Sequence, residues 1–453
     1  MKITILGTGY VGLTTGVALA YLGHDVCCLD TDERVIAQLQ QGEPPLYEPH
    51  LREMLELSRS RLRFTTSYAE AVPEAEVVFV AVGTPPRPDG SPDLQFVRAA
   101  ADTLGRNLGK GYTVVVNKST VPIGSGKWAR HVIEAAYFEV HGRDADGLVG
   151  VGSNPEFLRE STAVHDTLYP DRIVIGAADE RVLERLKELY RPLIEQKFPA
   201  PEFLPRPEGL EQVTLIATDP ASSELIKYAA NAFLALKISY INEIGLLASK
   251  VGGNIQTVAR GIGMDQRIGP RFLQPGLGWG GSCFGKDTSA LLTTADEHGV
   301  SMPIVHATRE MNGRMRVHVI EKLRGVYDSL ERKRISLLGL VFKPDTDDLR
   351  DAPSLEIIRR LNDHGAKVTV HDPRGLERFR SGPLAASVTI AESAEALFEG
   401  ADAVVLITEW REYLALDWAG LRAKMRGAVV VDGRNALKRE EMEAAGYRYL
   451  RIP

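Results

Sequence analysis

The sequence predicts an α/β protein with two open, doubly wound parallel-sheet domains joined by a long central helix. Short β-branched apolar runs alternate with helical patterns near both ends of the chain, as βαβ units require. Between them lies a run of about 30 residues with no internal proline, which predicts one helix. The length of 453 residues exceeds one ordinary core and suits two or three domains.

The first domain contains runs that are typical of buried strands at 2–6, 25–29, 77–81, 113–117, 147–153 and 171–176. Helical patterns at 11–22, 33–40 and 94–108 lie between the first four. The segment 199–212 is rich in proline and glutamate, so we expect a loop there.

The central helix is expected to begin after Asp219, an N-cap followed by Pro220 at the first helical position. Gly252 and Gly253 end it. It is apolar on more than one face, which indicates burial by neighbouring domains or by a second subunit. The second sheet is predicted from strands at 335–338, 367–371, 403–407 and 428–432 and a helix at 354–364. We expect domains at 1–212, 213–325 and 326–453.

Composition excludes several classes of protein. The net charge of −6 gives no electrostatic reason to expect nucleic acid or a membrane surface as a partner. The three cysteines are Cys27, Cys28 and Cys283, an odd number that argues against a disulfide framework and favours the cytoplasm. The uncharged run 3–23 resembles a signal peptide, but its glycines and threonines favour a strand and helix of a soluble fold.

A dinucleotide fingerprint lies at the start of the chain. Gly7, Gly9 and Gly12 form G-x-G-x-x-G with Tyr10 and Val11, after a strand and at the start of a helix. Such glycines bring backbone N–H groups close to a pyrophosphate, so a Rossmann-like NAD site is expected. Asp30, at the end of the second strand, would accept hydrogen bonds from the adenosine ribose hydroxyls. Its charge would repel a 2′-phosphate, which favours NAD over NADP.

Further cofactor contacts are expected from residues that follow strands, where open parallel sheets bind ligands. Thr84 and Thr120 follow the third and fourth strands, although each could be an ordinary turn hydroxyl. Arg34 lies one turn beyond Asp30 and could touch the ribose or be a surface arginine. Position 128 is Trp, so the nearby Gly-Ser-Gly-Lys stretch is not a Walker A loop.

The glycine-rich decapeptide 278–287 is the strongest candidate for chemistry. Cys283 stands among four glycines, with Lys286 and Asp287 within one turn. A nearby cation favours the nucleophilic thiolate, whereas Cys27 and Cys28 lie in a predicted core strand. Together, a nicotinamide cofactor and a nucleophilic thiol suggest oxidation at the aldehyde level.

Such chemistry needs an oxyanion stabiliser and carboxylates. Lys227 and Asn231 are spaced i,i+4 on the long helix and share one face. Glu156 and Glu160 follow the strand at 147–153. Taken alone, the lysine could be a solvated charge and the glutamates helix N-terminal charges.

The chain resembles the nucleotide-sugar 6-dehydrogenases of the UDP-glucose/GDP-mannose dehydrogenase family over essentially its whole length. The motifs that carry the resemblance are GTGYVG at 7–12, VGTPP at 82–86, STVP at 119–122, NPEFLRE at 154–160, ELIKYAANAFLA at 224–235, GMDQRIGPRFLQPGLGWGGSCFGKD at 263–287 and LGLVFKPDTDDLRDAPS at 338–354.

The resemblance implies oxidation of a sugar C6 alcohol to a carboxylate with two NAD, most closely in the branch that acts on UDP-glucose. Cys283 would hold a thiohemiacetal and then a thioester. Lys227 would stabilise the oxyanion, Asp287 and a water held by Thr120 would transfer protons, and Glu156 would assist hydrolysis. The second sheet, which lacks a close triple glycine, would bind the uridine end.

The remaining implied contacts form two sets. The set for NAD is Val11, Asp30, Glu160, Lys286 and Arg350, beside the fingerprint residues. The set for the UDP-sugar is Glu156, Phe157, Leu158, Arg159, Glu160, Lys227, Asn231, Phe272, Leu273, Gln274, Pro275, Gly276, Gly280 and Lys343, with Arg267 reaching the neighbouring subunit of a homodimer or dimer of dimers.

Three alternatives remain at this point. The protein could be a related nucleotide-sugar 6-dehydrogenase that acts on GDP-mannose or on an N-acetylated UDP-sugar. A two-electron dehydrogenase resembling the β-hydroxyacid enzymes would need neither Cys283 nor Glu156, and a non-catalytic NAD-binding regulator would have no use for Lys227 and Asp287. No histidine pattern predicts a metal site.

Overall fold

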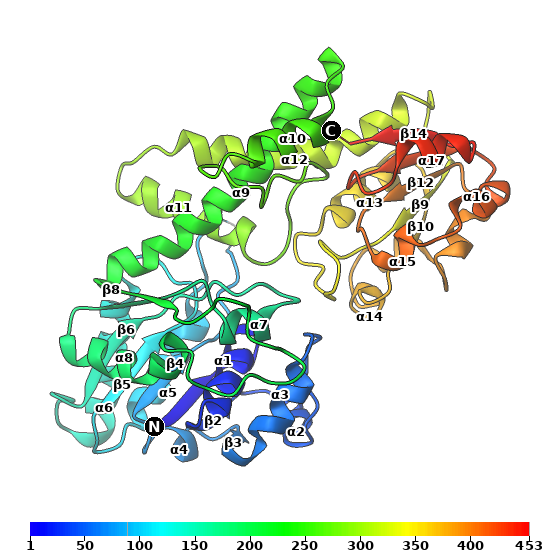
Figure 1. Cartoon of the computed structure of the whole chain (residues 1–453). Helices are drawn as coiled ribbons and strands as arrows, with labels where there is room; N and C mark the ends of the chain where they lie inside the picture. Colours follow the sequence, from blue (N-terminus) through cyan, green and yellow to red (C-terminus); the bar gives the residue numbers. More distant parts are fainter. Residues whose placement is uncertain (88, 453) are drawn as a thin grey trace. The chain divides into compact units, whose positions relative to one another are not determined.

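The computed structural model describes residues 1–87 and 89–452, which form two compact units (Figure 1). Unit 1 comprises Met1–Ala229 and Ser289–Thr294, and unit 2 comprises Ala230–Thr288 and the chain from Ala295 onward. The long helix α9 and the helix α11 each contribute to both units. The division into 1–212, 213–325 and 326–453 stays a prediction.

Unit 1 is built on an eight-stranded sheet with the order β3-β2-β1-β4-β5-β6-β7-β8. Its strands are β1 Lys2–Leu6, β2 Asp25–Leu29, β3 Leu62–Thr65, β4 Val77–Val80, β5 Thr113–Asn117, β6 Val149–Ser153, β7 Arg172–Ala177 and β8 Thr214–Thr218. Neighbouring strands are parallel except β6 and β7, which are antiparallel. The chain leaves β6 and enters β7 at the same end of the sheet, so no crossover is needed between them.

The helices of unit 1 alternate with its strands, as the sequence predicts. They are α1 Tyr10–Tyr21, α2 Glu33–Gln40, α3 Leu51–Ser58, α4 Tyr68–Ala71, α5 Gln95–Arg106, α6 Ser125–His141, α7 Ala163–Leu168 and α8 Glu180–Ile194. Two apolar clusters, one containing Ile5 and Phe79 and the other Val78 and Val115, fill the two faces of the sheet. Strand residues buried on both faces read as continuous apolar runs, which is why the sequence identifies them well.

Two strands of this sheet were not expected. β3 lies at one edge and β8 at the other, and their side chains are mostly half-buried or exposed. An edge strand packs on fewer neighbours, so its sequence carries a weaker apolar signal. The segment 199–212 contains neither helix nor strand, which confirms the predicted loop.

The long helix α9 is Pro220–Val251, in agreement with the predicted start and end (Figure 1). By length and composition α9 could cross a membrane, which the sequence reading did not anticipate. Its buried polar side chains, including Ser239 and Asn242, are bonded to other parts of the protein. Such bonding is typical of a helix inside a folded core. Helices α10 Ile255–Gly263, α11 Phe284–Glu297 and α12 Pro303–Arg324 follow.

Unit 2 contains a six-stranded parallel sheet with the order β11-β10-β9-β12-β13-β14. The strands are β9 Arg334–Leu338, β10 Lys367–His371, β11 Thr389–Ile390, β12 Ala403–Leu406, β13 Val429–Asp432 and β14 Arg448–Arg451, and the helices are α13 Pro353–Asp363, α14 Leu376–Arg380, α15 Arg411–Leu414, α16 Trp418–Leu421 and α17 Arg439–Ala444. The two predicted α/β domains are confirmed as two separate parallel-sheet cores.

Candidate active site

The turn between β1 and α1 has the geometry of a dinucleotide-binding loop. Gly7 has φ +95°, and a Cβ on Gly12 would lie 1.9 Å from the carbonyl oxygen of Gly7. These two glycines are therefore required by the turn itself. Gly9 is exposed and a Cβ there would meet no protein atom within 4 Å. The space over Gly9 at the start of α1 fits a pyrophosphate at a helix N-terminus.

Asp30 lies at the end of β2 and is half-buried. Its Oδ2 accepts hydrogen bonds from Thr8 N at 2.9 Å and Thr8 Oγ1 at 2.8 Å, and its Oδ1 accepts one from Asp32 N at 3.1 Å. The carboxylate is thus fixed beside the glycine turn with one face accessible. Arg34 is exposed and pairs with Asp32 at 2.8 Å, so a role for Arg34 in cofactor binding stays a prediction.

The loops after β4 and β5 meet beside this turn. Thr84 Oγ1 donates to the carbonyl of Thr120 at 3.0 Å, and Ser119 Oγ donates to the carbonyl of Val82 at 2.6 Å. Tyr10 donates through its hydroxyl to the carbonyl of Tyr47. The hydroxyl of Thr84 is therefore used in holding the Thr120 loop, while Thr120 itself is half-buried.

Glu156 and Lys227 form a buried ion pair that the sequence did not predict. Lys227 Nζ donates to Glu156 Oε1 at 2.7 Å, and both side chains are less than one-tenth exposed. The N–H of Leu158 donates to Glu156 Oε2 at 2.9 Å, and Lys227 Nζ lies 5.7 Å from the ring centre of Phe157. Burial of a paired charge is costly unless function or further bonding supports it, which marks this pair as a functional candidate.

The segment that carries these residues is held by contacts that were not predicted. The guanidinium of Arg159 donates two hydrogen bonds to Asp166, at 2.9 and 2.6 Å, and the main-chain N–H of Arg159 donates a third at 2.9 Å. Glu160 is half-buried. Glu48 is buried and accepts from the N–H groups of Ser161 and Ala163 at 2.8 and 2.7 Å, at the start of α7. The sequence around Glu48 does not predict these contacts, because the partners lie more than a hundred residues away.

Cys283 immediately precedes α11 and is half-buried. The N–H of Asp287 donates to its carbonyl at 2.8 Å, so the cysteine is the last residue before the first helical turn. Lys286 lies three residues after the thiol in the first turn of α11, and a helix start and a nearby cation are surroundings that generally favour a thiolate. In contrast, burial raises the pKa of both Cys27 and Cys28, which agrees with the structural role predicted for those two thiols.

Asp287 joins α11 to the long helix. Its Oδ2 accepts from Asn231 Nδ2 at 2.6 Å, its Oδ1 lies 3.5 Å from Lys286 Nζ, and it is fully buried. Arg309 of α12 donates to the Gly285 carbonyl and to Thr288 Oγ1 at 2.8 and 2.9 Å. The start of α11, with the thiol, is therefore held by side chains from two other helices.

The glycines before Cys283 have a different reason from the one expected. A Cβ on Gly278 would lie 2.2 Å from Asn312 Oδ1, one on Gly280 2.5 Å from the Asp351 carbonyl, and one on Gly281 2.9 Å from the ring of Phe342. In the sequence alone, four glycines within 278–287 indicate a backbone that a ligand approaches closely. Close packing against the protein itself accounts for them, and a contact of Gly280 with substrate stays a prediction.

The predicted substrate loop 272–276 is packed against the second sheet and the long helix. Leu273 is buried in an apolar cluster with Ile241 and Ala259, so its side chain is not open to a ligand. The N–H of Gly276 donates to Asn242 Oδ1, and Asn435 Nδ2 donates to the Pro275 carbonyl. Phe272 has φ +64°, a strained conformation of the kind that clusters at ligand sites, and Gln274 is exposed.

The remaining predicted residues lie on loops. Arg350 makes a two-pronged contact with the buried Asp348, and Lys343 lies half-buried in the same loop after β9. Arg267 is exposed and pairs with Asp265 at 2.6 Å. The structure brings Glu156 to Lys227 and Asp287 to Asn231, whereas the ligand contacts of the loop residues stay predictions.

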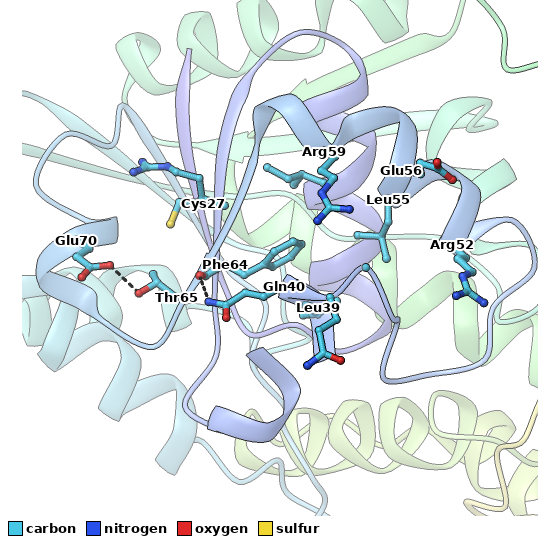
Figure 2. Close-up of a pocket in the computed structure, with 14 residues that line it drawn as sticks. Cys27, Leu39, Gln40, Arg52, Leu55, Glu56, Arg59, Phe64, Thr65 and Glu70 are labelled. Atoms are coloured by element: carbon cyan, nitrogen blue, oxygen red, sulfur yellow. Dashed lines mark hydrogen bonds between the residues drawn. The ribbon is translucent and has the colours of Figure 1, made fainter. Parts of the chain in front are cut away.

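A sizeable cavity of unit 1 lies away from these residues. It has a volume of about 610 Å³, opens between α2, α3 and β3, and is lined by Cys27, Leu39, Gln40, Gln41, Gly42, Arg52, Leu55, Glu56, Arg59, Leu62, Arg63, Phe64, Thr65 and Glu70 (Figure 2). None of the predicted catalytic or ligand-binding residues lines it. We therefore place the site by its chemistry and not by the size of the hollow.

The fold and these side chains define a class of protein: a dehydrogenase with a dinucleotide turn, a thiol at a helix start and a buried Glu–Lys pair. The sequence matches the profiles of the UDP-glucose/GDP-mannose dehydrogenase family, namely its NAD binding domain at residues 1–194, its central domain at 221–314 and its UDP binding domain at 336–439. The chain belongs to this family, and NAD is its cofactor.

Relatives and solved structures agree with this assignment. The UDP-glucose 6-dehydrogenase of Rhizobium meliloti is 44% identical over 458 residues, covering 100% of this chain and 99% of the relative. A UDP-glucose dehydrogenase from Pyrobaculum islandicum superimposes with a TM-score of 0.87 at 39% identity, covering 99% and 97% of the two chains. A UDP-D-ManNAc dehydrogenase from Pyrococcus horikoshii gives 0.84 at 25% identity, covering 100% and 99%.

Proposed function

We propose that this protein oxidises the C6 alcohol of UDP-glucose to a carboxylate and reduces two NAD for each substrate. One observation carries the proposal: Cys283 stands at the start of α11, beside Lys286 and the Asp287–Asn231 contact, in a chain of this family. A simple two-electron alcohol dehydrogenase would have no use for a thiol in that position. NAD, when bound at the Gly7–Gly12 turn, accepts the hydride in each oxidation.

The protein's own residues divide the remaining work. Asp287, through a water, takes the proton of the alcohol, and loss of the first hydride from C6 leaves an aldehyde. The Cys283 thiolate then adds to the C6 aldehyde, which forms a carbon–sulfur bond and a thiohemiacetal. Loss of a second hydride leaves a thioester. Water attacks this carbonyl, the carbon–sulfur bond breaks, and the carboxylate and the thiol are released.

The buried pair in unit 1 supports the charge-handling part of this scheme. Lys227 would stabilise the oxyanion that develops at C6, and Glu156, bonded to Lys227 at 2.7 Å, would direct the hydrolytic water. Thr120 would hold the water through which Asp287 transfers protons. The main-chain N–H groups and basic side chains of the loop after β9, among them Lys343, would contact the diphosphate or the uridine.

An assay with the pure protein tests this function. We expect two NADH for each UDP-glucose consumed, with UDP-glucuronate as product. One NADH per substrate, or faster turnover of GDP-mannose or of an N-acetylated UDP-sugar, would replace the proposal with one of those alternatives. Tight NAD binding without turnover of any nucleotide sugar would favour a regulator.

A thiol variant tests the covalent step. We expect Cys283→Ser to lose complete oxidation by about a thousandfold or more, because a hydroxyl is a far weaker nucleophile near neutral pH. Cys27→Ala serves as the matched thiol control and should retain two NADH per substrate. Full four-electron turnover in Cys283→Ser would assign the nucleophile elsewhere.

A homodimer built on α9 is part of the same proposal. Phe233, Tyr240 and Leu247 are spaced by seven residues on α9 and, with Val251, have exposed fractions of 61, 48, 59 and 73%. An apolar stripe with heptad spacing is typical of a helix that packs on another helix. We expect a dimer by light scattering and a monomer for Tyr240→Glu/Leu247→Glu. A location in the cytoplasm also stays a prediction.

A further inference from the structure

A second, very small cavity lies in unit 1 where β5 and β6 end beside the start of α9. Its volume is about 20 Å³, and its wall includes Asn117, Lys118, Thr120, Glu224, Lys227 and Tyr228. That volume accommodates one water molecule, which needs roughly 10–15 Å³, and no ligand larger than water. The wall combines apolar surface with several polar side chains, which offer a water molecule hydrogen-bond partners.

Three buried polar atoms at this cavity have no protein partner among the described residues. They are both side-chain atoms of Asn117 and Oε1 of Glu224. Asn117 is 2% exposed and Glu224 is 5% exposed. An unsatisfied buried polar group costs about 1–3 kcal/mol, and a water molecule that accepts from and donates to these atoms would remove that penalty.

Glu224 is a fixed carboxyl group with an unusual titration. Its Oε2 accepts from the N–H of Gly124 at 2.7 Å, which anchors the side chain and leaves Oε1 for the cavity. Burial raises the pKa of Glu224 from 4.5 to about 7, although the Gly124 hydrogen bond lowers it. A group that titrates near neutral pH can both hold and release a proton under working conditions.

The charged neighbours of Glu224 at the cavity are two lysines. Lys227 is on the same helix, one turn away, and pairs with Glu156 beyond the cavity. Lys118, on the segment after β5, donates to Asn154 Oδ1 at 2.8 Å. Burial lowers the pKa of Lys118 to about 8, with Glu156 raising it and Lys227 lowering it. Tyr228 adds a hydroxyl to the same wall.

We propose that this cavity holds one water molecule, bound by Asn117 and Glu224, which passes protons between Lys227 and Glu224. The proposal deepens the proposed function, because it rests on Lys227 acting in the oxidation. Glu224 is then a positioning residue that acts through Lys227 and does not itself touch the substrate.

The proton transfer balances without any further reactant. Lys227 Nζ gives a proton to the water oxygen, and the water gives one of its own protons to Glu224 Oε1. The ammonium becomes an amine, the carboxylate becomes a carboxylic acid, and the water is unchanged. The reverse transfer restores Lys227 as a cation for the next charged intermediate. Glu224 stores the proton in the meantime.

Infrared spectroscopy of the substrate-free protein tests the proton on Glu224. We expect a carbonyl band of a buried carboxylic acid at pH 6 that disappears with a midpoint near pH 7. Glu224→Gln should remove the band, whereas Glu188→Gln, at an exposed glutamate of α8, should keep it. A carbonyl region that is the same in Glu224→Gln and in the unmutated protein would overturn the proposal.

The link to Lys227 is tested in the same way. Lys227→Met removes the cation, so the midpoint of the Glu224 band should rise by roughly one pH unit if the two groups are coupled through the water. An unchanged midpoint would overturn the relay. A high-resolution crystal structure should contain one water bonded to Asn117 and Glu224, and a dry cavity would also overturn it.

Thermal stability gives a readout that does not depend on Lys227. Because the pKa of Glu224 is raised on folding, the folded protein binds more protons than the unfolded chain between about pH 4.5 and 7, and stability falls as pH rises through this window. Glu224→Gln should lose this decline, so its melting temperature should exceed that of the unmutated protein at pH 8 and approach it at pH 5. The opposite pH dependence would exclude a stored proton on Glu224.

Measurements of turnover complete the test, and they distinguish failure of the proton relay from failure of the proposed function. Glu224→Gln should lower kcat by roughly tenfold and remove a limb near pH 7 from its pH profile, with KM little changed. Two NADH per UDP-glucose in the variant, with an unaltered pH profile, would overturn the relay and leave the function intact. The infrared and melting experiments need no substrate, so they remain decisive even if UDP-glucose is not oxidised.

Discussion

The two parallel sheets begin with the same turn and use it differently. In unit 1 the order β3-β2-β1-β4-β5-β6 corresponds to β11-β10-β9-β12-β13-β14 in unit 2. Gly7 follows β1 with φ +95°, and Gly339 follows β9 with φ +101°. After Gly7 the chain enters α1 almost at once, whereas after Gly339 it forms a loop that lasts until α13 begins at Pro353.

The carboxylates that follow the second strand of each sheet show what this difference means. Asp372 is 1% exposed and accepts from the N–H groups of Leu340, Val341, Arg374 and Gly375 and from the indole of Trp410. Asp30 occupies the corresponding place, is half-buried, and accepts only from Thr8 and Asp32 among the described residues.

The comparison teaches that one backbone design can serve structure or binding. The buried carboxylate has its oxygens occupied by the protein, and the accessible one retains acceptor capacity for a ribose. The segment that follows the first strand of each sheet determines whether the carboxylate is accessible. A long loop covers Asp372, whereas the start of a helix leaves Asp30 open. The following substitutions would break or sharpen this comparison.

The largest effect is expected for Asp372→Ala. Removing the carboxylate leaves several buried donors without an acceptor, so the free energy of unfolding should fall by about 4 kcal/mol. Denaturant unfolding followed by tryptophan fluorescence measures this, because Trp410 and Trp418 lie in unit 2. A loss below about 1 kcal/mol would mean that Asp372 is no more structural than Asp30.

The next effect separates two glycines of one turn. Gly12→Ala places a methyl group against the carbonyl of Gly7 and should lower stability by about 3 kcal/mol. Gly9→Ala meets no protein atom and should change stability by less than about 1 kcal/mol, while weakening NAD binding. Calorimetry measures the free energy of unfolding, and titration with NAD measures the Kd. Equal NAD affinity in Gly9→Ala would place the pyrophosphate elsewhere.

A binding effect is expected for Asp30→Ala. Loss of hydrogen bonds to the ribose should raise the Kd for NAD by about 10- to 100-fold, since each such bond to a charged acceptor contributes about 1.5–3 kcal/mol. The preference for NAD over NADP should shrink with it. Titration with both cofactors measures this. Unchanged binding of NAD would remove the contrast between the two carboxylates.

The smallest effect is expected for Arg34→Ala. The exposed Arg34–Asp32 pair contributes little to stability, so the melting temperature should not change. The Kd for NAD should change by no more than roughly threefold, because a surface arginine is screened by solvent and salt. A tenfold change in the Kd would show that Arg34, in addition to Asp30, contributes to binding of the ribose.

The sequence predicts the central strands of both sheets and the long helix well. Those strands are buried on both faces, so their residues must be apolar without interruption. It misses β3 and β8 because edge strands such as these, with exposed side chains, carry little such constraint. It also misses the antiparallel pairing of β6 with β7, since strand direction depends on the path of the chain from 154 to 171 and not on composition.

The site was predicted by residue type and only partly by contact. Cys283, Lys286 and Asp287 are close in sequence, so their grouping follows from spacing alone. The pairing of Lys227 with Glu156 joins residues 71 positions apart and has no local signal. Asn117, Lys118 and Glu224 were missed for the same reason, although a lysine two residues after the apolar run 114–116 is a signal of unusual burial that could have identified Lys118.

The three cysteines differ in a way that matters for anyone who handles this protein. Cys27 and Cys28 are buried, and burial raises the pKa of each thiol. Cys283 is half-buried and immediately precedes α11. Peroxide or a maleimide dye should therefore modify Cys283 far faster than the other two. A fluorophore could be attached at the thiol that we propose as the nucleophile, and storage without a reducing agent should oxidise that thiol first.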